Sequence, residues 1–342
     1  MKKIFFTMLL LATFILSGCN TQAAINRDEQ IGSSSNAGDK LKISMLNIKH
    51  GDAILIQTGK QTVLVDTAIT GEHADLVNQL EKLSVTKIDK IILTHPHYDH
   101  TGGAQMLINP NKKQLEAYPY LKNITVTEVY DNGLPYESAV YKGYMKAIKA
   151  KGIPLHGLKV GDTLDFGDGV KFKVLFPTSE YLETIKNEQF DKEDKAYNIN
   201  NRSIVGRLTY KDFSMMFTGD CEKESEAKIL ANNNAEDLKC DVLKSGHHGH
   251  RTSSTKEFIA AINPNVVLIS AGPPTEDRVN TYRPPYPQTI KTYLAQGIDK
   301  KKIYCTRWNG IITVTSDGKN FSVQPEKKED WIDSWLAKWK KK

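Results

Sequence analysis

Cysteine is scarce in this sequence, with four residues among 342. Apart from Cys19, only Cys221, Cys240 and Cys305 remain, and an odd number of cysteines argues against a framework of disulfide bonds. One disulfide together with one free thiol is still compatible with the sequence. The sequence has too few cysteines for a metal site made of several thiolates. A metal site here is therefore expected to use histidine and carboxylate ligands.

The sequence also lacks a hydrophobic run long enough to span a membrane comfortably. Its longest N-terminal apolar run, Ile4 to Leu16, follows the basic start Met1-Lys2-Lys3 and ends in small residues, which is typical of a signal peptide. The ending Leu16-Ser17-Gly18-Cys19 resembles a bacterial lipobox. That resemblance implies cleavage before Cys19 and attachment of lipid to its sulfur, and ordinary secretion with a chance cysteine is the alternative.

Few apolar side chains occur between residues 20 and 40, so this segment cannot form a core and is predicted to be a flexible tether. We therefore predict a signal peptide over residues 1–18, a lipidated cysteine and tether over 19–40, one large domain over 41–325, and an amphipathic basic helix over 326–342. The protein is then expected outside the cytoplasm, anchored to a bacterial membrane by lipid or secreted.

No internal repeat of solenoid length and no nucleic-acid recognition motif is visible. The formal net charge is +6, and part of it lies in the signal peptide and in the C-terminal lysines. The other basic residues are dispersed, which argues against a nucleic-acid binding module. In the C-terminal helix, Trp331, Trp335 and Trp339 share one face. We expect this face to dock on the domain, with a position on a bilayer surface as the alternative.

From Leu41 the sequence alternates short apolar runs with turn residues. Strands are predicted at 41–48, 53–57, 62–66, 124–130, 164–166, 170–176, 203–209 and 213–218. Helices are predicted near 73–83 and 137–150. Because the strands form two blocks with helices between them, rather than a strict alternation of strand and helix, two packed sheets covered by helices are favoured.

The densest group of reactive side chains comprises His95, His97, Asp99 and His100. They follow the apolar run Ile91-Ile92-Leu93 and are expected on a loop at the end of a buried strand. His95 and His97 can point the same way and give two nitrogen ligands to one ion, while Asp99 and His100 reach a second ion. Imidazole and carboxylate ligands suit zinc, with manganese or iron as alternatives.

Two later strands also end in candidate ligands. The first leads into Gly219-Asp220, where a carboxylate beside a glycine can bridge two ions. The second leads into Gly246-His247-His248-Gly249-His250, so that six of the nine histidines fall in two loops. Asp66, which ends an earlier apolar strand, is either a turn residue or a partner that orients a metal-bound histidine.

Together these motifs resemble the metallo-β-lactamase superfamily over roughly residues 42–324. The stretches 47–53, 201–205 and 243–254 are similar to the extracytoplasmic domain of ComEC competence proteins and to phosphorylcholine esterase domains of choline-binding wall proteins. The resemblance implies an α/β fold, namely an αββα sandwich of two mixed sheets flanked by helices, with a two-metal site at one edge.

Carried over residue by residue, the resemblance assigns His95 and His97 to the first ion, Asp99 and His100 to the second, and Asp220 to both. It implies two divalent ions, with zinc preferred and manganese as the alternative.

One of His247 and His248 completes the second set; His248 is preferred, which leaves the other for a substrate phosphate. Where many members have a further histidine, this chain has Asn200, which could ligate weakly or through water. Residues 280–287 lack the histidines that ComEC-like domains tend to carry. Cys221, next to the bridging aspartate, is expected to be buried or to bind metal.

The implied activity is hydrolysis by a hydroxide held between two metal ions, with Asp99 orienting the water or relaying its proton. Because both similar domains cleave phosphodiesters, we expect a phosphodiesterase, with Lys244, Arg251 and Ser253 close enough to bind phosphate oxygens. The expected substrate is a small or polymeric phosphodiester: a nucleic acid such as DNA, or a phosphorylcholine-type wall or lipid compound.

Two alternatives remain open at this stage. One is a lactam or thioester hydrolase of the same superfamily, which is less favoured because the loop after Ser270 lacks a histidine. The other is a lipoprotein that binds metal or ligand without turnover. No protein partner is inferred, and the lipid anchor is the predicted link to the membrane.

Overall fold

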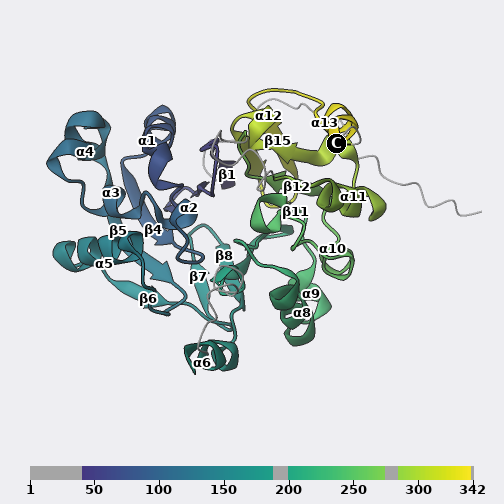
Figure 1. Ribbon diagram of the computed structural model, residues 1–342, viewed down its shortest axis with the longest axis horizontal. Helices are drawn as coiled ribbons and strands as arrows, with labels where there is room; N and C mark the ends of the chain where they lie inside the picture. Colours follow the sequence, from purple (N-terminus) through teal and green to yellow (C-terminus); the bar gives the residue numbers. More distant parts are fainter. Residues whose placement is uncertain (1–40, 188–198, 274–283, 340–342) are drawn as a thin grey trace, which may run out of the picture. The chain divides into compact units, whose positions relative to one another are not determined.

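Two β-sheets form the centre of the computed structural model, which describes residues 41–187, 199–273 and 284–339 (Figure 1). Sheet A has eight strands in the order β15-β14-β1-β2-β3-β4-β5-β6. These strands are β15 (Phe321–Pro325), β14 (Ile312–Ser316), β1 (Leu41–Met45), β2 (Ile54–Gln57), β3 (Thr62–Val65), β4 (Lys87–Ile92), β5 (Thr125–Asp131) and β6 (Leu155–Gly157).

Sheet B has seven strands in the order β13-β12-β11-β10-β9-β8-β7. These strands are β13 (Ile303–Cys305), β12 (Val266–Ile269), β11 (Val242–Lys244), β10 (Phe213–Phe217), β9 (Val205–Tyr210), β8 (Val170–Phe176) and β7 (Thr163–Asp165). Both sheets contain parallel and antiparallel pairs, so both are mixed.

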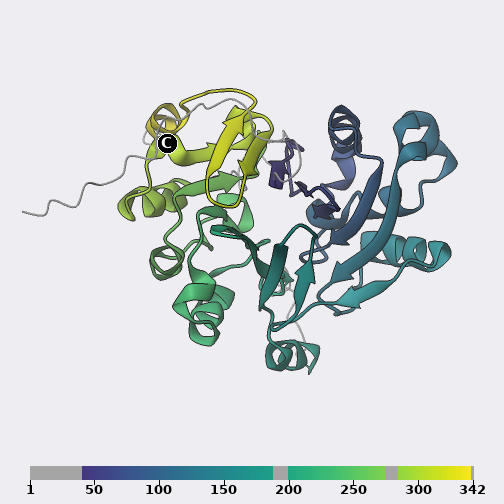
Figure 2. The same ribbon diagram turned by 180° about the vertical axis from the view of Figure 1, so that it is seen from behind.

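Helices cover the outer face of each sheet (Figures 1 and 2). Sheet A carries α1 (His73–Lys82), α3 (Ala104–Ile108), α4 (Lys112–Ala117) and α5 (Ala139–Lys151). Sheet B carries α8 (Lys223–Asn232), α10 (Lys256–Ile262), α11 (Pro287–Ala295) and α13 (Ile332–Trp339). The other helical elements of the described residues are η1 (Thr70–Glu72), α2 (Tyr98–Thr101), η2 (Pro119–Asn123), α6 (Ser179–Asn187), α9 (Ala235–Leu238), η3 (Gly246–Gly249), η5 (Lys300–Lys302) and α12 (Thr306–Asn309).

The pattern of apolar residues explains this layering. In β8, Val170, Phe172 and Val174 are buried between the sheets, while Lys171 and Lys173 alternate with them and are exposed. The central strand β10 is buried throughout, because its odd-numbered side chains enter the core between the sheets and Met216 packs under the helices of sheet B. A strand covered on both faces loses the alternation of apolar and polar residues. The predicted αββα sandwich is thus confirmed.

Parallel pairing in both sheets determines where the candidate ligands lie. In sheet A, β3 runs parallel to β4, with Val65 opposite Ile92, and in sheet B, β10 runs parallel to β11, with Met216 opposite Leu243. The residues that follow the carboxyl ends of these four strands are Asp66, the His95 loop, Asp220 and the His247 loop. All four segments therefore emerge at strand ends that can meet at one edge of the sandwich.

The predicted strands differ from the observed ones mainly at their ends. The predicted strand 41–48 stops at Met45, because the chain then turns toward the histidine loop, where Asp52 N donates to Asp99 O at 3.2 Å. The predicted strand 203–209 begins at Val205, because Ser203 and Ile204 contact the same loop instead.

The C-terminal helix packs on sheet B through its tryptophan face. Trp331 and Trp335 are buried and Trp339 is partly buried against the same cluster. The Trp331 ring stacks on Trp308 with 4.2 Å between ring centroids. The face that shares the three tryptophans is therefore engaged by the domain, as expected. Among the helices of the described residues, none is both long and apolar enough to cross a membrane.

The predicted signal peptide, the tether and Cys19 lie outside the described residues, as do residues 280–283 of the histidine-free loop 280–287. Cys221, Cys240 and Cys305 are described, and each is a buried free thiol. The pair of cysteines that the sequence left open is therefore not formed among these three residues.

Candidate metal centre

The loop after β4 presents its side chains in two groups. His97 has an extended backbone and precedes the single-turn helix α2, whose residue Thr101 donates from Oγ1 to the His97 carbonyl oxygen at 3.1 Å. This turn places His95 and His97 before the helix and Asp99 and His100 within it. The change from extended to helical backbone therefore divides one short motif between two clusters of donor atoms.

The first cluster contains His95, His97 and Asp220, whose donor atoms all lie within 4.8 Å of one another. His95 Nε2 is 3.0 Å from His97 Nδ1 and 3.8 Å from Asp220 Oδ2. His95 is buried, and its Nδ1 lies 3.2 Å from Thr94 Oγ1 and 3.3 Å from Ser203 Oγ. These contacts hold the ring with Nε2 toward the aspartate.

The second cluster contains Asp99, His100, Asp220 and His248, again within 4.8 Å. Asp220 Oδ2 is 3.2 Å from His100 Nε2 and 3.4 Å from His248 Nε2. Asp99 Oδ2 is 3.6 Å from His248 Nε2. Since Asp220 Oδ2 also faces His95, one carboxylate oxygen is common to both clusters, which is the arrangement of a bridging ligand.

Asp66 orients His100 from the side opposite the cluster. Its Oδ2 is 2.8 Å from His100 Nδ1, and its two oxygens accept from the Thr94 N–H and hydroxyl, each at 2.8 Å. A carboxylate on the remote ring nitrogen fixes the tautomer and leaves Nε2 for a metal ion. The sequence allowed two roles for Asp66, a turn residue or a partner of a histidine, and in the structure Asp66 contacts a histidine.

A second buried carboxylate supports the centre through Lys244. Asp52 Oδ2 is 2.5 Å from Lys244 Nζ, and Asp52 Oδ1 is 3.4 Å from His248 Nδ1. Lys244 also donates to the Gly219 carbonyl oxygen at 2.7 Å. Gly51, next to Asp52, lets the chain pass close to the backbone of the histidine loop, because a Cβ there would lie 1.8 Å from the Asp99 carbonyl oxygen.

The electrostatics of the clusters favour a cation. Burial opposes ionisation of Asp220, but His100, His248 and His247 outweigh it and hold the pKa of Asp220 well below its ordinary value. Burial lowers the pKa of His95 well below its ordinary value, so this ring is neutral and can ligate. The other oxygen of this carboxylate, Asp220 Oδ1, is buried, accepts no hydrogen bond within the described residues and lies 3.8 Å from Lys244 Nζ, so Oδ2 is the oxygen that faces the histidines.

His247 lies beside the two clusters rather than within either of them. Its Nδ1 is 2.7 Å from Glu222 Oε1, and its Nε2 is 3.8 Å from Asp220 Oδ2. Glu222, His247 and His250 form a further group of donor atoms. The preference for His248 in the second cluster thus agrees with the geometry.

The other residues that the sequence suggested as substrate contacts or supports of the ligands differ in their burial. Lys244 and Ser253 are buried, and Ser253 Oγ donates to the carbonyl oxygens of Gly246 and His250, so both residues support the loops rather than face a substrate phosphate. Arg251 is exposed, with its guanidinium 5.6 Å from the centroid of the Tyr286 ring. Asn200 is buried, and its Nδ2 is 3.3 Å from Glu222 Oε1 and 3.5 Å from His247 Nδ1.

Of the two expectations for Cys221, burial or metal binding, the structure agrees with burial. It is buried, with Sγ 3.1 Å from Ser225 Oγ, and burial raises the pKa of its thiol well above the ordinary value. A thiol that keeps its proton is a poor metal ligand.

Sequence reasoning missed the roles of Asp52, Ser203 and Glu222. Asp52 and Ser203 lie within stretches that carried the family resemblance, but nothing in their spacing indicates a contact with a histidine. Glu222 follows Asp220 by two residues, and this proximity was the only available signal.

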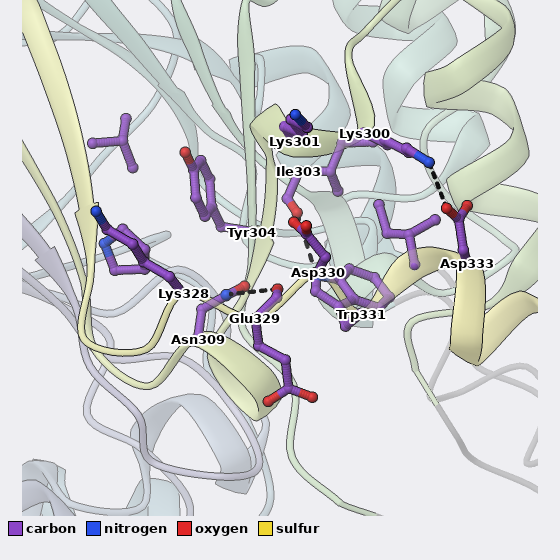
Figure 3. Close-up of a pocket in the computed structure, with 13 residues that line it drawn as sticks. Lys300, Lys301, Ile303, Tyr304, Asn309, Lys328, Glu329, Asp330, Trp331 and Asp333 are labelled. Carbon is purple, nitrogen blue, oxygen red and sulfur yellow. Dashed lines mark hydrogen bonds and ion pairs between the residues drawn. The ribbon is translucent and has the colours of Figure 1, made fainter.

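A cavity of about 560 Å³ lies elsewhere, between the edge strands β13 and β15 and the start of α13 (Figure 3). Its lining includes Tyr304, Trp331, Lys301 and Lys328 but no histidine. This cavity is therefore separate from the two metal clusters.

Comparison with known proteins agrees with this geometry. The model of the metallo-beta-lactamase superfamily matches residues 47–272, which include both clusters. The chain belongs to this superfamily. Because the matched segment covers more than half of the chain and the site has nitrogen and oxygen donors, the protein is a metal-dependent hydrolase of the metallo-β-lactamase fold.

Three curated relatives are similar to it. ComE operon protein 3 from Bacillus subtilis is 27% identical over 304 residues, which are 83% of this chain and 34% of that protein. Competence protein ComA from Neisseria gonorrhoeae is 23% identical over 258 residues, which are 75% of this chain and 30% of that protein. A UPF0173 metal-dependent hydrolase from Bacillus mycoides is 26% identical over 192 residues, 55% of this chain and 68% of that protein.

The chain thus spans about a third of the length of these two competence relatives. Among solved structures, the metallo-beta-lactamase fold protein YhfI from Bacillus subtilis is similar with a TM-score of 0.47 and 13% identity, over 80% of this chain and 99% of that protein. The resemblance to competence proteins is confirmed.

Proposed function

We propose that this superfamily hydrolase is an extracytoplasmic phosphodiesterase that acts through two divalent metal ions. Zinc is the preferred metal, and manganese is the alternative. The observation that carries the proposal is the single oxygen, Asp220 Oδ2, shared by a cluster with His95 and His97 and a cluster with Asp99, His100 and His248. These six residues would hold the ions. When bound, two such ions supply an activated water and stabilise charge on phosphoryl oxygens.

We assign the orientation of the attacking water to Asp99. Its side chain is 18% exposed, whereas those of His100 and His248 are at most 3% exposed. Burial opposes its ionisation, but His100 and His248 prevail and hold the pKa of Asp99 far below its ordinary value. Asp99 is therefore a carboxylate at neutral pH, and it can accept a hydrogen bond from water at Oδ1 or Oδ2.

We assign contact with the substrate phosphate to Arg251 and His247. Arg251 is exposed on the loop that carries the histidines, and a guanidinium binds phosphate oxygens with paired hydrogen bonds. His247 faces the shared oxygen from the edge of the centre. Lys244 and Ser253 are buried and are left out of this contact, because their polar atoms already have partners.

Within this class, two substrates are proposed. Extracellular DNA agrees with the similarity to competence proteins, and a phosphorylcholine-type wall or lipid phosphodiester agrees with an enzyme held at the cell envelope. Degradation of single-stranded DNA, set against release of choline phosphate from wall polymer, separates them.

The test uses bis(p-nitrophenyl) phosphate and protein loaded with zinc or manganese. We expect turnover that a chelator abolishes and that His97→Ala reduces by at least about 100-fold, since a ligand of the centre is lost. His156→Ala is the matched control, because His156 is an exposed histidine on β6 and belongs to neither cluster. Turnover that is indifferent to chelator would sink the proposal. Elemental analysis that finds no metal would favour a binding lipoprotein, and turnover of a lactam alone would favour a lactamase.

A further inference from the structure

Helix α8 holds the loop of His247 through two glutamates one turn apart. Glu222 immediately precedes the helix and contacts His247 and Thr252, while Glu226 accepts from the backbone N–H groups of Ser254 and Thr255. Both carboxylates are buried. The helix that begins after the shared Asp220 therefore also fixes the opposite loop of the centre.

The loop requires this support because its backbone is strained. His247 and His248 have φ of 44° and 54°, in the left-handed region that residues with a Cβ seldom adopt. This conformation turns both rings toward Asp220, with Nε2 at 3.8 Å for His247 and 3.4 Å for His248. His248 is further fixed by the Ser270 carbonyl oxygen, 3.0 Å from its Nδ1.

Glu222 contacts the Nδ1 side of His247 in the same way that Asp66 contacts the Nδ1 side of His100. Its Oε1 is 2.7 Å from His247 Nδ1, just as Asp66 Oδ2 is 2.8 Å from His100 Nδ1. Thr252 Oγ1 donates to the same Glu222 oxygen at 2.5 Å, and Asn200 Nδ2 is 3.3 Å from it. With the Glu222 oxygen as acceptor, Nδ1 of His247 is the donor in this contact, and Nε2 is the nitrogen that faces the centre.

A buried carboxylate is expensive to retain unless it serves a partner. Glu222 belongs to neither donor cluster that shares Asp220, and its Oε2 accepts no hydrogen bond within the described part of the chain. We propose that Glu222 is a positioning residue, which fixes the His247 ring with Nε2 toward the oxygen common to the two clusters. Its effect on turnover rests on the proposed function, in which His247 contacts the substrate.

The experiment compares three variants of the zinc-loaded protein. Glu222→Met keeps the length of the side chain but removes the acceptor, Glu222→Gln restores an acceptor oxygen, and Glu224→Gln is the control on the same helix, because Glu224 is more exposed and does not contact His247. Each is examined by NMR of ¹⁵N-histidine-labelled protein, by metal analysis and by kinetics with bis(p-nitrophenyl) phosphate. A His247→Gln sample assigns the His247 signals.

We expect the hydrogen-bonded Nδ1–H signal of His247 to be present in the wild type and in Glu224→Gln, retained but shifted in Glu222→Gln, and lost in Glu222→Met. The kcat should fall by about 10- to 100-fold in Glu222→Met with KM changed less than about threefold, and Glu222→Gln should recover part of it. All variants should keep two ions per chain.

An unchanged His247 signal in Glu222→Met would overturn the proposal, and so would loss of one ion, because Glu222 would then support a ligand. If the wild type does not cleave phosphodiesters while the NMR pattern appears as expected, the proposed function fails and the positioning role stands.

Discussion

At the scale of single residues, the centre depends on carboxylates that face histidine nitrogens from both sides. Asp220 lies between the rings of His95, His100 and His248, and Asp66 contacts the far nitrogen of His100. The near side supplies ligand atoms, and the far side sets the tautomer and the direction of the ring. Substitutions on the far side should therefore weaken metal binding without removing a ligand.

We expect Asp66→Asn to lower metal affinity by about 10- to 100-fold while the fold is retained, because an amide of the same shape no longer holds the proton on His100 Nδ1 as firmly. Competition with a chromophoric chelator measures the change. Asp89→Asn is the control, since Asp89 accepts from Thr62 N at 2.8 Å within sheet A and contacts no histidine of the centre. Equal affinity in the two variants would contradict the role assigned to Asp66.

At the scale of elements, helix α8 connects the Asp220 loop with the His247 loop. Glu226 is buried on this helix, and burial raises its pKa to about 7 from an ordinary value of 4.5, although hydrogen bonds from Thr255 and Ser254 oppose the rise. A carboxyl group with a raised pKa keeps its proton in the folded state over a range in which the unfolded chain has lost it. The folded protein should therefore be less stable at the upper end of that range.

The pH dependence follows from this difference. Between about pH 4.5 and pH 7, the folded state binds more protons than the unfolded state at Glu226, so the free energy of unfolding falls as pH rises, by about 3 kcal/mol in total. Glu226→Gln should not show this component. Urea denaturation of both proteins from pH 5 to pH 8 measures it: the wild type should lose stability relative to the variant as pH rises. Parallel curves would show that Glu226 does not titrate in this range.

The elements also show how far sequence reasoning reached. The motif from His95 to His100, Asp220 and the His247-His248 pair could be recognised because each follows an apolar strand, and the structure places all three at strand ends of the sandwich. The strand ends were less predictable. Residues after Met45 and before Val205 leave their sheets because they contact the histidine loop, which lies far from them in sequence.

At the scale of the whole molecule, the centre joins two sheets that come from different parts of the chain. His95 to His100 follow β4 of sheet A, whereas Asp220 and His248 follow strands of sheet B. The family match from 47 to 272 covers both parts, and the tryptophan face of α13 packs on sheet B. The C-terminal helix therefore covers part of the outer face of sheet B, the sheet whose strands lead to Asp220 and His248.

The attachment of this molecule to a membrane is proposed through the lipid on Cys19. We expect the full-length chain, expressed in a bacterium with lipoprotein processing, to fractionate with membranes and to incorporate labelled fatty acid. Cys19→Ser should lose the label, because the sulfur that carries the lipid is absent. Cys240→Ser, at a buried thiol, is the control. Label that persists in Cys19→Ser would contradict lipid attachment at this residue.

The sequence by itself determined the superfamily, the layered fold and most candidate ligands of this protein, because these depend on apolar periodicity and on residues close together in the chain. Only the tertiary structure decided that His248 joins the second cluster while His247 pairs with Glu222, that Lys244 is buried against Asp52, and that Cys221 keeps its proton. Each of these outcomes depends on distances between loops from different strands and on exclusion of water. The spacing of residues along the chain determines neither these distances nor the exclusion of water, so both become visible only in the folded chain.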